Sequence, residues 1–232
     1  MHLFFSQHIN DGLIQLEADE SRHLAKVLRL AVGAKVEIID GKGNRYSCEV
    51  IDPNPKKSIV QVLSTFTDHH LYGVSIAAAP TKNINRWEWF LEKATEIGID
   101  AIQPLVTNNS ERKVLKMDRQ ERILVSAMKQ SYKTQLPRLK ELLKFNTFIN
   151  QSFEGEKYVA HCYENIERLE LNNIHPKGKK ALILIGPEGD FTESEVQQAI
   201  AAGFKSVSLS KSRLRTETAA LVACHTLNLL NA

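Results

Sequence analysis

Two short polar segments near the end of the chain combine residue types that suit ligand binding. The segment 186–191, GPEGDF, has glycines three positions apart, which permit close approach to the backbone and positive φ angles that other residues resist. The segment 210–217, SKSRLRTE, places three cations within five residues. Together they predict a cleft in which backbone groups hold a small molecule beside cationic side chains. Each segment alone also fits a simpler interpretation, a proline-glycine turn or a solvated basic turn.

The elements that must position these segments are predicted by hydrophobic pattern and capping. Ala181–Ile185 is an apolar run typical of a buried strand, and 206–209 predicts a second strand. Between them, Thr192 followed three residues later by Glu195 forms a capping box, and the helix that starts there ends before Gly203. Both polar segments therefore follow strand ends, where α/β proteins bind their ligands.

Residues 73–232 predict an α/β domain with a mainly parallel sheet, because strands and helices alternate along them. A first strand is expected at 74–79 and another at 158–162. One helix is expected to end at Gly98, and another is expected to be capped by Asp118 with Glu121. Their buried stripes are predicted to be Trp87, Phe90, Leu91 and Ala94 in the first, and Ile123, Leu124, Ala127 and Met128 in the second.

Residues 1–70 predict a small β-rich domain, followed by a polar linker at 67–72 that contains His69 and His70. A glycine-rich hairpin signal joins the first two of its longer strands, and one or two helical turns are expected at 20–27. The expected strands are 36–39, 46–51 and 59–66.

Composition and charge narrow the classes of function. The 232 residues are 43% hydrophobic with a net charge of +3, but residues 80–144 hold 13 Lys or Arg against 8 Asp or Glu. A basic middle region fits a polyanionic partner, and it also fits a solvated face. Cys48, Cys162 and Cys224 are scattered, which argues against a disulfide framework and a zinc site. Without a signal peptide or a membrane-spanning run, we expect a soluble cytoplasmic protein with no metal.

The two C-terminal segments resemble a known pair of motifs. LILIGPEGDFTESEV, followed by LSKSRLRTETAA, is similar in order and separation to the motifs of the RsmE-type 16S ribosomal RNA uridine-N3 methyltransferases, which belong to the SPOUT class of S-adenosylmethionine enzymes. RHLAKVLRLAVGAKVEIIDGKGNRYSCEV resembles the PUA-like barrel of the same family. Three residues depart from the pattern: Asp190 and Ser210 stand where glycines are usual, and Lys133 replaces an arginine.

This resemblance implies a fold, a cofactor and partners. Residues 73–232 would form a SPOUT-type trefoil-knotted α/β domain that binds S-adenosylmethionine, preceded at 1–70 by a PUA-like β-barrel that binds RNA. The substrate would be N3 of a uridine in 16S ribosomal RNA, uridine 1498 of the small subunit, in an assembled 30S subunit, and the enzyme would be a homodimer. The alternatives are a SPOUT enzyme acting on another RNA and a catalytically silent RNA-binding or ribosome-assembly factor.

The resemblance also implies roles for particular residues. Arg215 would stabilise charge on the uracil, and Glu217 would accept its proton or, alternatively, would only favour the start of the last helix. Nine residues would bind the cofactor: His161, Leu184, Gly186, Pro187, Glu188, Gly189, Leu209, Leu214 and Thr216. For His161, a core or surface position is the alternative. Five residues would contact RNA, or would only cover their domains: Arg22, Lys26, Arg29, Arg112 and Lys133.

Overall fold

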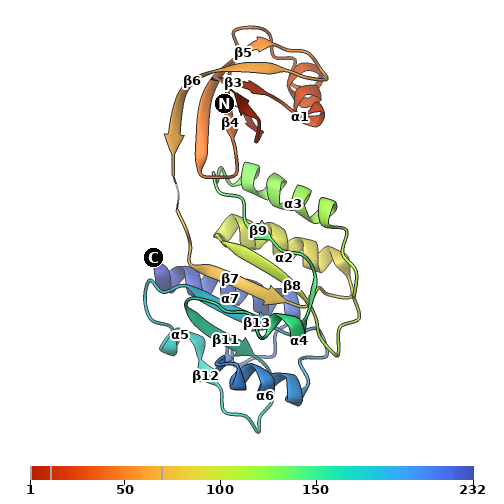
Figure 1. Ribbon diagram of the computed structural model, residues 1–232, viewed down its shortest axis with the longest axis vertical. Coiled ribbons are helices and arrows are strands. Elements are labelled where there is room, and N and C mark those ends of the chain that lie inside the picture. The colour runs from red at the N-terminus through yellow and green to blue at the C-terminus, as the bar shows by residue number, and fades with distance from the viewer. Residues whose placement is uncertain (1, 11, 69) are drawn as a thin grey trace. The chain divides into compact units, whose positions relative to one another are not determined.

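The computed structural model describes residues 2–10, 12–68 and 70–232 (Figure 1). The chain forms two compact units, one of residues 1–70 with 125–136 and the other of residues 71–124 with 137–232. The sequence predicted two contiguous domains, 1–70 and 73–232, and so placed residues 125–136 in the second of them. His69, expected in the linker beside His70, lies outside the described residues.

The described part of the first unit contains a mixed six-stranded sheet with the strand order β1-β4-β5-β6-β3-β2. β1 pairs with β4 in parallel and the other neighbours are antiparallel, so the predicted β4–β5 hairpin is confirmed. The predicted helical turns form α1 (Ala18–Arg22) and the π-helical turn η1 (His23–Val27). The strands are β1 (His2–Phe5), β2 (Ile9–Asn10), β3 (Leu13–Gln15), β4 (Lys35–Ile39), β5 (Asn44–Asp52) and β6 (Ile59–Thr67).

Residues 125–136 join the first unit through backbone and side-chain contacts. The second half of α3 (Met117–Gln130) brings Lys129 to Glu20, with which it forms an ion pair. Beyond the helix, the N–H of Gly43 donates to the carbonyl of Thr134 at 3.0 Å, and the N–H of Leu136 donates to the carbonyl of Gly41 at 2.9 Å. These long-range bonds have no counterpart in a hydrophobic pattern, which explains why the sequence did not predict this grouping.

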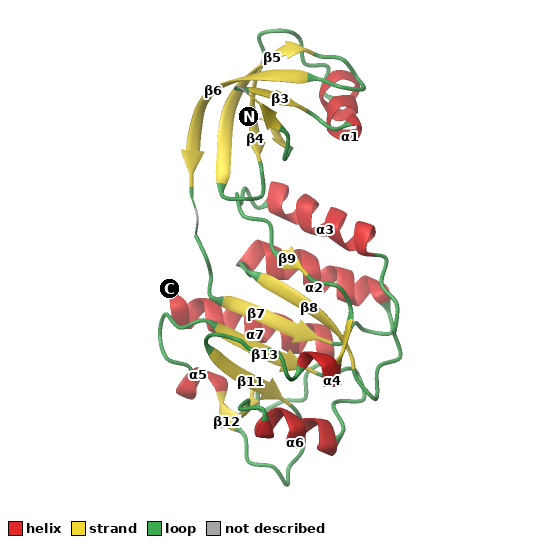
Figure 2. Ribbon diagram, in the orientation of Figure 1, coloured by secondary structure: helices red, strands yellow, loops and turns green. Residues whose placement is uncertain are grey.

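The described part of the second unit contains an eight-stranded sheet whose recorded pairings are all parallel, which confirms the predicted α/β class. Its order is β10-β8-β7-β13-β11-β14-β12, and β9 pairs with β8 (Figure 2). The strands are β7 (Val74–Ala78), β8 (Ala101–Val106), β9 (Arg138–Leu139), β10 (Leu143–Lys144), β11 (Glu156–Ala160), β12 (Leu169–Glu170), β13 (Ala181–Ile185) and β14 (Lys205–Ser208).

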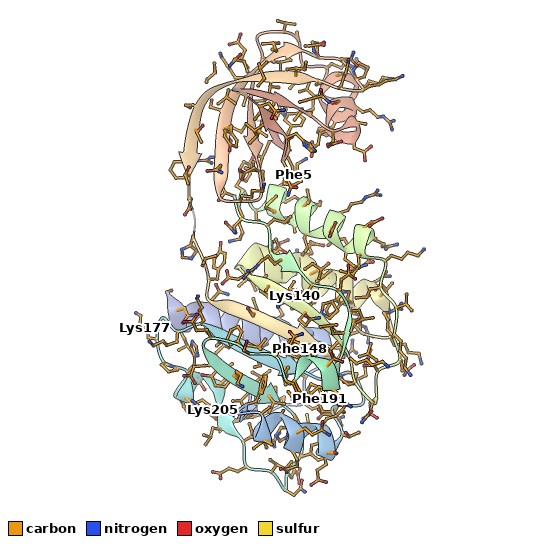
Figure 3. The ribbon with its side chains drawn as sticks, viewed as in Figure 1. Phe5, Lys140, Phe148, Lys177, Phe191 and Lys205 are labelled. Atoms are coloured by element: carbon orange, nitrogen blue, oxygen red, sulfur yellow. The ribbon has the colours of Figure 1, made fainter. Side chains whose placement is uncertain are left out.

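Helices cover both faces of this sheet (Figure 2). α2 (Ile84–Ile97) and α7 (Thr216–Asn231) pack on each other, and α7 contacts β7 and β13. On the other face, α4 (Phe145–Phe148) and α6 (Glu193–Ala201) enclose a core that includes Phe148 and Phe191 (Figure 3). The short helix α5 (Leu171–Ile174) follows β12.

Local sequence signals account for the helix boundaries next to the site. The capping box at α6 is confirmed, because Thr192 and Glu195 bond each other's backbone N–H groups. The predicted stripe of α2 is buried, and the helix ends at Gly98, whose φ is +125°. Three predictions next to the site were displaced. α3 begins at Met117, so that Asp118 lies in its first turn, β11 ends at Ala160 rather than at residue 162, and β14 spans Lys205–Ser208 rather than 206–209.

Candidate functional site

The parallel register brings three strand ends together in the second unit. Ala160 at the end of β11 is paired with Ile185 at the end of β13 and with Val207 near the end of β14. The segments that follow these strands therefore begin at the same edge of the sheet. This edge, formed by the carboxyl ends of parallel strands, is where open α/β sheets bind ligands.

A cavity of about 730 Å³ lies at this edge, within the range of small-molecule sites. All three segments contribute to its lining, together with the first turn of α7. The lining residues are Ala160, His161, Cys162, Glu164, Arg168, Ile185, Gly186, Pro187, Glu188, Asp190, Val207, Ser208, Leu209, Ser210, Lys211, Ser212, Arg213, Leu214, Arg215, Thr216 and Ala219.

Most of the residues predicted to bind a cofactor lie in this lining. Seven of the nine do: His161, Gly186, Pro187, Glu188, Leu209, Leu214 and Thr216. Leu184 and Gly189 are not among the described lining residues. The side chain of Leu184 belongs to the buried core beneath α4 and α6, and a Cβ on Gly189 would lie 3.3 Å from Cβ of Asn109. Their part in binding stays a prediction.

Position 186 requires glycine because there is no room for a Cβ atom, and not because its φ angle is unusual. A Cβ added to it would lie 2.8 Å from the backbone nitrogen of Phe191 and 3.1 Å from the carbonyl carbon of Asp190. The positive φ expected at the glycines of this segment is found instead at Asp190, at 62°. The turn therefore folds back closely on its own backbone, and only a residue without Cβ fits at its start.

The glycine-rich turn is held by the segment that follows β8. The side-chain amide of Asn109 donates to the carbonyls of Gly189 and Asp190 at 3.1 and 3.0 Å. The N–H of Asn108 donates to the carboxylate of Glu195, the capping residue of α6, at 2.9 Å. A segment that follows β8 therefore fixes both the turn and the helix that begins after it.

The segment before α2 holds the same turn from another side. The N–H of Lys82 donates to Oε1 of Glu188 at 2.9 Å. The guanidinium of Arg112 donates to the carbonyls of Thr81 and Lys82 at 3.0 and 2.6 Å. Arg112, predicted to contact RNA, thus fixes this backbone in the structure, and its RNA contact stays a prediction.

His161 is buried at the cavity and serves as a link between strands. Its Nδ1 accepts from the N–H of Tyr163 at 3.2 Å, so the neutral ring carries its proton on Nε2, which lies 2.6 Å from Oγ of Ser206. Burial is the main cause that lowers the pKa of His161, and the cation of Arg168 lowers it further, whereas Asp190 opposes the shift. The ring is therefore held neutral near pH 7.

A second part of the cavity lining, the cationic wall, is formed by residues 210–215. Lys211, Arg213 and Arg215 are exposed in its lining, and within the part of the chain that the structure describes they have no ion pair. Arg168, in the segment after β11, adds a fourth cation and donates to the carbonyl of His161 at 2.9 Å. Arg168 was not predicted from the sequence, because it lies in an irregular stretch without a periodic pattern or a recognisable motif.

Glu217 lies apart from the cavity lining, which does not support its predicted role. Its side chain is 8% exposed, and Oε1 lies 3.8 Å from Nε of Arg86 on α2. Oε2 is buried without a hydrogen-bond partner among the described residues. The position two residues into α7 turns this side chain toward α2, whereas Arg215, just before the helix, faces the cavity.

The remaining predicted RNA contacts belong to the first unit. Arg22, Lys26 and Arg29 are exposed on or beside α1 and η1, and Lys133 is half-buried after α3. Arg29 has a positive φ of 54°. Nothing in the first unit tests whether these cations bind RNA, so their roles stay predictions.

Among residues 2–10, 12–68 and 70–232, no three His, Cys, Asp or Glu side chains gather in a way that could hold a metal ion. In the same residues, no helix has the length and apolar character needed to cross a membrane.

The fold and cavity define an α/β protein that binds a small molecule beside a cationic wall, and comparison with known proteins identifies its family. Residues 68–228 match the model of an RNA methyltransferase domain, and residues 16–63 match that of an RNA methyltransferase PUA domain. The chain belongs to this family of RNA methyltransferases, which confirms the resemblance seen in the motifs.

Named relatives agree with this assignment. The chain is 30% identical to a ribosomal RNA small subunit methyltransferase E from Synechocystis, over 97% of this chain and 75% of the relative. A probable rRNA methyltransferase from Porphyromonas gingivalis has 37% identity and a TM-score of 0.92, with coverage of 100% and 98%. A ribosomal RNA small subunit methyltransferase E from Neisseria gonorrhoeae, solved with S-adenosyl methionine, has 26% identity and a TM-score of 0.86, with the same coverage.

Proposed function

We propose that this protein transfers a methyl group from S-adenosylmethionine to N3 of a uridine in 16S ribosomal RNA. Family membership supports the class of reaction, and the observation that carries the proposal is the cavity between the glycine-rich turn and the cationic wall. The finer parts of the proposal are the uracil N3 atom, the assembled 30S subunit as substrate, and a homodimer as the active form. This substrate would place the reaction in the cytoplasm.

The residues around the cavity fit S-adenosylmethionine. Gly186 allows the turn to fold back on its own backbone at the cavity, and Ile185, Leu209 and Leu214 supply apolar surface for an adenine ring. The carboxylate of Glu188 is exposed in the lining, where it can face the positive charge of the cofactor. When bound, S-adenosylmethionine supplies a methyl group that is already activated by its sulfonium.

The chain must then hold the uracil and make N3 electron-rich. N3 carries a proton and is buried in a Watson–Crick pair, so the target base must be unpaired or flipped out. Loss of the N3 proton would leave negative charge shared with the two uracil carbonyl oxygens. N3 would then take the methyl group as the bond from that group to the cofactor sulfur breaks, with S-adenosylhomocysteine as the leaving group. Arg215, exposed in the lining at the start of α7, can donate to these oxygens and stabilise that charge.

The proton on N3 needs an acceptor inside the cavity. Glu188 and Asp190 already accept hydrogen bonds from the backbone, and Glu217 lies outside the described lining. Glu164 is exposed in the lining without a hydrogen bond in the described structure. We therefore favour Glu164 over Glu217 as the acceptor, to be tested by comparing the rate of methyl transfer in Glu164→Gln and Glu217→Gln across pH.

The test of the proposed function is a transfer assay with mapping of the product. Labelled S-adenosylmethionine is incubated with 30S subunits from a strain that lacks the enzyme, and mass spectrometry identifies the modified nucleotide. We expect methylation at uridine N3 and a rate about 100- to 1,000-fold lower in Arg215→Ala, with cofactor affinity unchanged. Arg215→Lys separates charge from guanidinium geometry, and Lys177→Ala, in the loop before β13, is the control (Figure 3).

Two outcomes would contradict the proposal in different ways. Methylation of another RNA, with 30S subunits left unmodified, would contradict the proposed substrate and leave the proposed methyl transfer in place. Failure of the wild-type protein to bind S-adenosylmethionine would favour a silent RNA-binding factor. Light scattering tests the homodimer separately, and the trefoil knot implied by the resemblance stays a prediction.

A further inference from the structure

Asp190 adopts a backbone conformation that is unusual for its residue type. Its φ is 62°, in the left-handed region that glycine enters freely and that most L residues avoid. Aspartate is one of the few exceptions, because its short polar side chain can bond nearby backbone groups. The position lies in the cavity lining, at the end of the turn that begins with Gly186.

The carboxylate of Asp190 makes two backbone hydrogen bonds in different segments. Oδ1 accepts from the N–H of Phe191 at 2.8 Å, within its own turn. Oδ2 accepts from the N–H of Cys162 at 2.8 Å, in the segment that follows β11. Each oxygen of one side chain is therefore used, and together they join two of the three segments that form the cavity.

The joined segments are also connected next to this bridge. The hydroxyl of Tyr163 donates to the carbonyl of Phe191 at 2.9 Å, and the carbonyl of Asp190 accepts from Asn109 on the other side. Because β11 ends at Ala160, bonds of this kind and not a strand ladder hold the segment after it against the turn. Asp190 thus lies where a small displacement would open or narrow the cavity.

We infer that Asp190 is a positioning residue of the cofactor site, whose carboxylate fixes the segment after β11 against the glycine-rich turn and thereby sets the shape of the cavity before the cofactor binds. This inference rests on the proposed function. A glycine at this position would supply the turn alone, whereas aspartate supplies both the turn and the bridge. The departure from the family pattern then adds a constraint to the loop instead of weakening it.

Three substitutions separate the two contributions. Asp190→Gly keeps the left-handed turn and removes the bridge, so we expect the dissociation constant of S-adenosylhomocysteine to rise about tenfold, the order of one lost charge-assisted hydrogen bond. Asp190→Asn keeps one acceptor and should lose less. Asp190→Ala loses the bridge and also strains the turn, so it should bind about fivefold more weakly than Asp190→Gly.

Asp100 offers a matched control for a purely structural role. Its carboxylate also accepts two backbone hydrogen bonds, from Tyr72 and Gly73, both at 2.8 Å. These contacts lie before β7 and β8, at the opposite edge of the sheet from the cavity. We expect Asp100→Asn and Asp190→Asn both to lower the melting temperature, but only Asp190→Asn to weaken S-adenosylhomocysteine binding in the folded protein.

Cys162 gives a second readout that does not need the cofactor. Burial, followed by the charge of Asp190, raises the pKa of its thiol. Removal of the carboxylate should lower that pKa and loosen the segment, so iodoacetamide should alkylate Cys162 about threefold faster in Asp190→Gly near pH 8. Cys48 and Cys224 are buried and serve as internal controls.

Calorimetric titration with S-adenosylhomocysteine, run beside the alkylation assay, tests the inference. Weaker binding in Asp190→Gly, partial recovery in Asp190→Asn and unchanged binding in Asp100→Asn would support it. Wild-type affinity in Asp190→Gly would overturn it while leaving the proposed function in place. Failure of the wild-type protein to bind the probe would overturn the proposed function and the inference together.

Discussion

The two segments that line the cavity after β13 and β14 are built in opposite ways. The turn 186–191 accepts hydrogen bonds from Asn109, from Lys82 and from Cys162, which belong to three other segments of the chain. In the segment 210–215, the described side-chain hydrogen bonds are local, such as the one from the N–H of Ser212 to Oγ of Ser210 at 3.1 Å. One wall is fixed before any ligand binds, and the other presents exposed cations.

This difference assigns a separate task to each wall. A fixed backbone turn loses little conformational entropy when it binds a small molecule, which favours affinity for the cofactor. Exposed cations that contact a polyanion release the counterions condensed on it, which favours affinity for RNA. We therefore expect changes in the turn to act on cofactor binding and changes in the cationic wall to act on RNA binding.

The largest effect on cofactor binding is expected at the start of the fixed turn. A Cβ in Gly186→Ala would lie 2.8 Å from the nitrogen of Phe191, and backbone cannot yield as a flexible side chain does. Overpacking of about 1–3 kcal/mol should weaken S-adenosylhomocysteine binding about 10- to 100-fold. Gly189→Ala is the matched comparison, because its nearest contact is 3.3 Å, to Asn109. Equal losses in both variants, measured by calorimetry, would contradict this account.

A smaller effect is expected when the contact that holds the turn is removed. Asn109→Ala deletes two hydrogen bonds to the carbonyls of Gly189 and Asp190. Because these bonds are exposed, we expect a loss of about 1 kcal/mol, or about fivefold in S-adenosylhomocysteine affinity. Asn150→Ala removes an exposed bond to the carbonyl of Asn146 in α4 and is the control. Unchanged binding in Asn109→Ala would mean that the turn keeps its shape unaided.

Substitutions in the cationic wall should change the salt dependence of 30S binding and leave cofactor affinity unchanged. Removing Lys211 and Arg213 should reduce the slope of log affinity for 30S subunits against log salt by about 0.7–0.9 for each cation that contacts phosphate. The same double variant should bind S-adenosylhomocysteine as the wild type does. Lys177→Ala, at the opposite edge of the sheet, should leave both quantities unchanged. A salt slope that stays constant would show that this wall does not contact phosphate.

The smallest effect concerns His161, which lies in the cavity lining outside both of these segments. Burial lowers the pKa of its imidazole below the ordinary value of 6.5, so the unfolded chain binds this proton more strongly than the folded chain. The stability that the neutral ring contributes is complete above about pH 6.5 and is lost as the pH falls below it. His161→Asn should therefore show a smaller drop in unfolding free energy between pH 7.5 and pH 5.5 than the wild type. Denaturant titrations of both proteins at the two pH values measure this drop in unfolding free energy.

The sequence predicted the elements around the site well, because local signals specify them. The capping box of Thr192 and Glu195, the apolar run of β13 and the stripe of α2 each depend on residues close in sequence. The paired motifs identified the family and located most of the lining. Hydrophobic periodicity and short sequence patterns predict these features without knowledge of the tertiary structure.

The sequence could not predict how distant segments hold one another. The side chain of Asn109 holds the glycine-rich turn from 80 positions away, and no motif indicated this contact. Arg168 faces the cavity from an irregular stretch, and Glu217 points away from it although it lies in the second motif. The bridge from Asp190 to Cys162 spans 28 positions. Such contacts depend on strand order and helix rotation, which no local pattern encodes.

The division of tasks between the two walls is tested most directly by measuring two affinities in two variants. S-adenosylhomocysteine and 30S binding are titrated for Gly186→Ala and for the double variant Lys211→Ala with Arg213→Ala. We predict that Gly186→Ala loses affinity for the small molecule and keeps its affinity for 30S subunits, while the double variant does the reverse. Parallel loss of both affinities in both variants would contradict the account, because the walls would then act as a single unit.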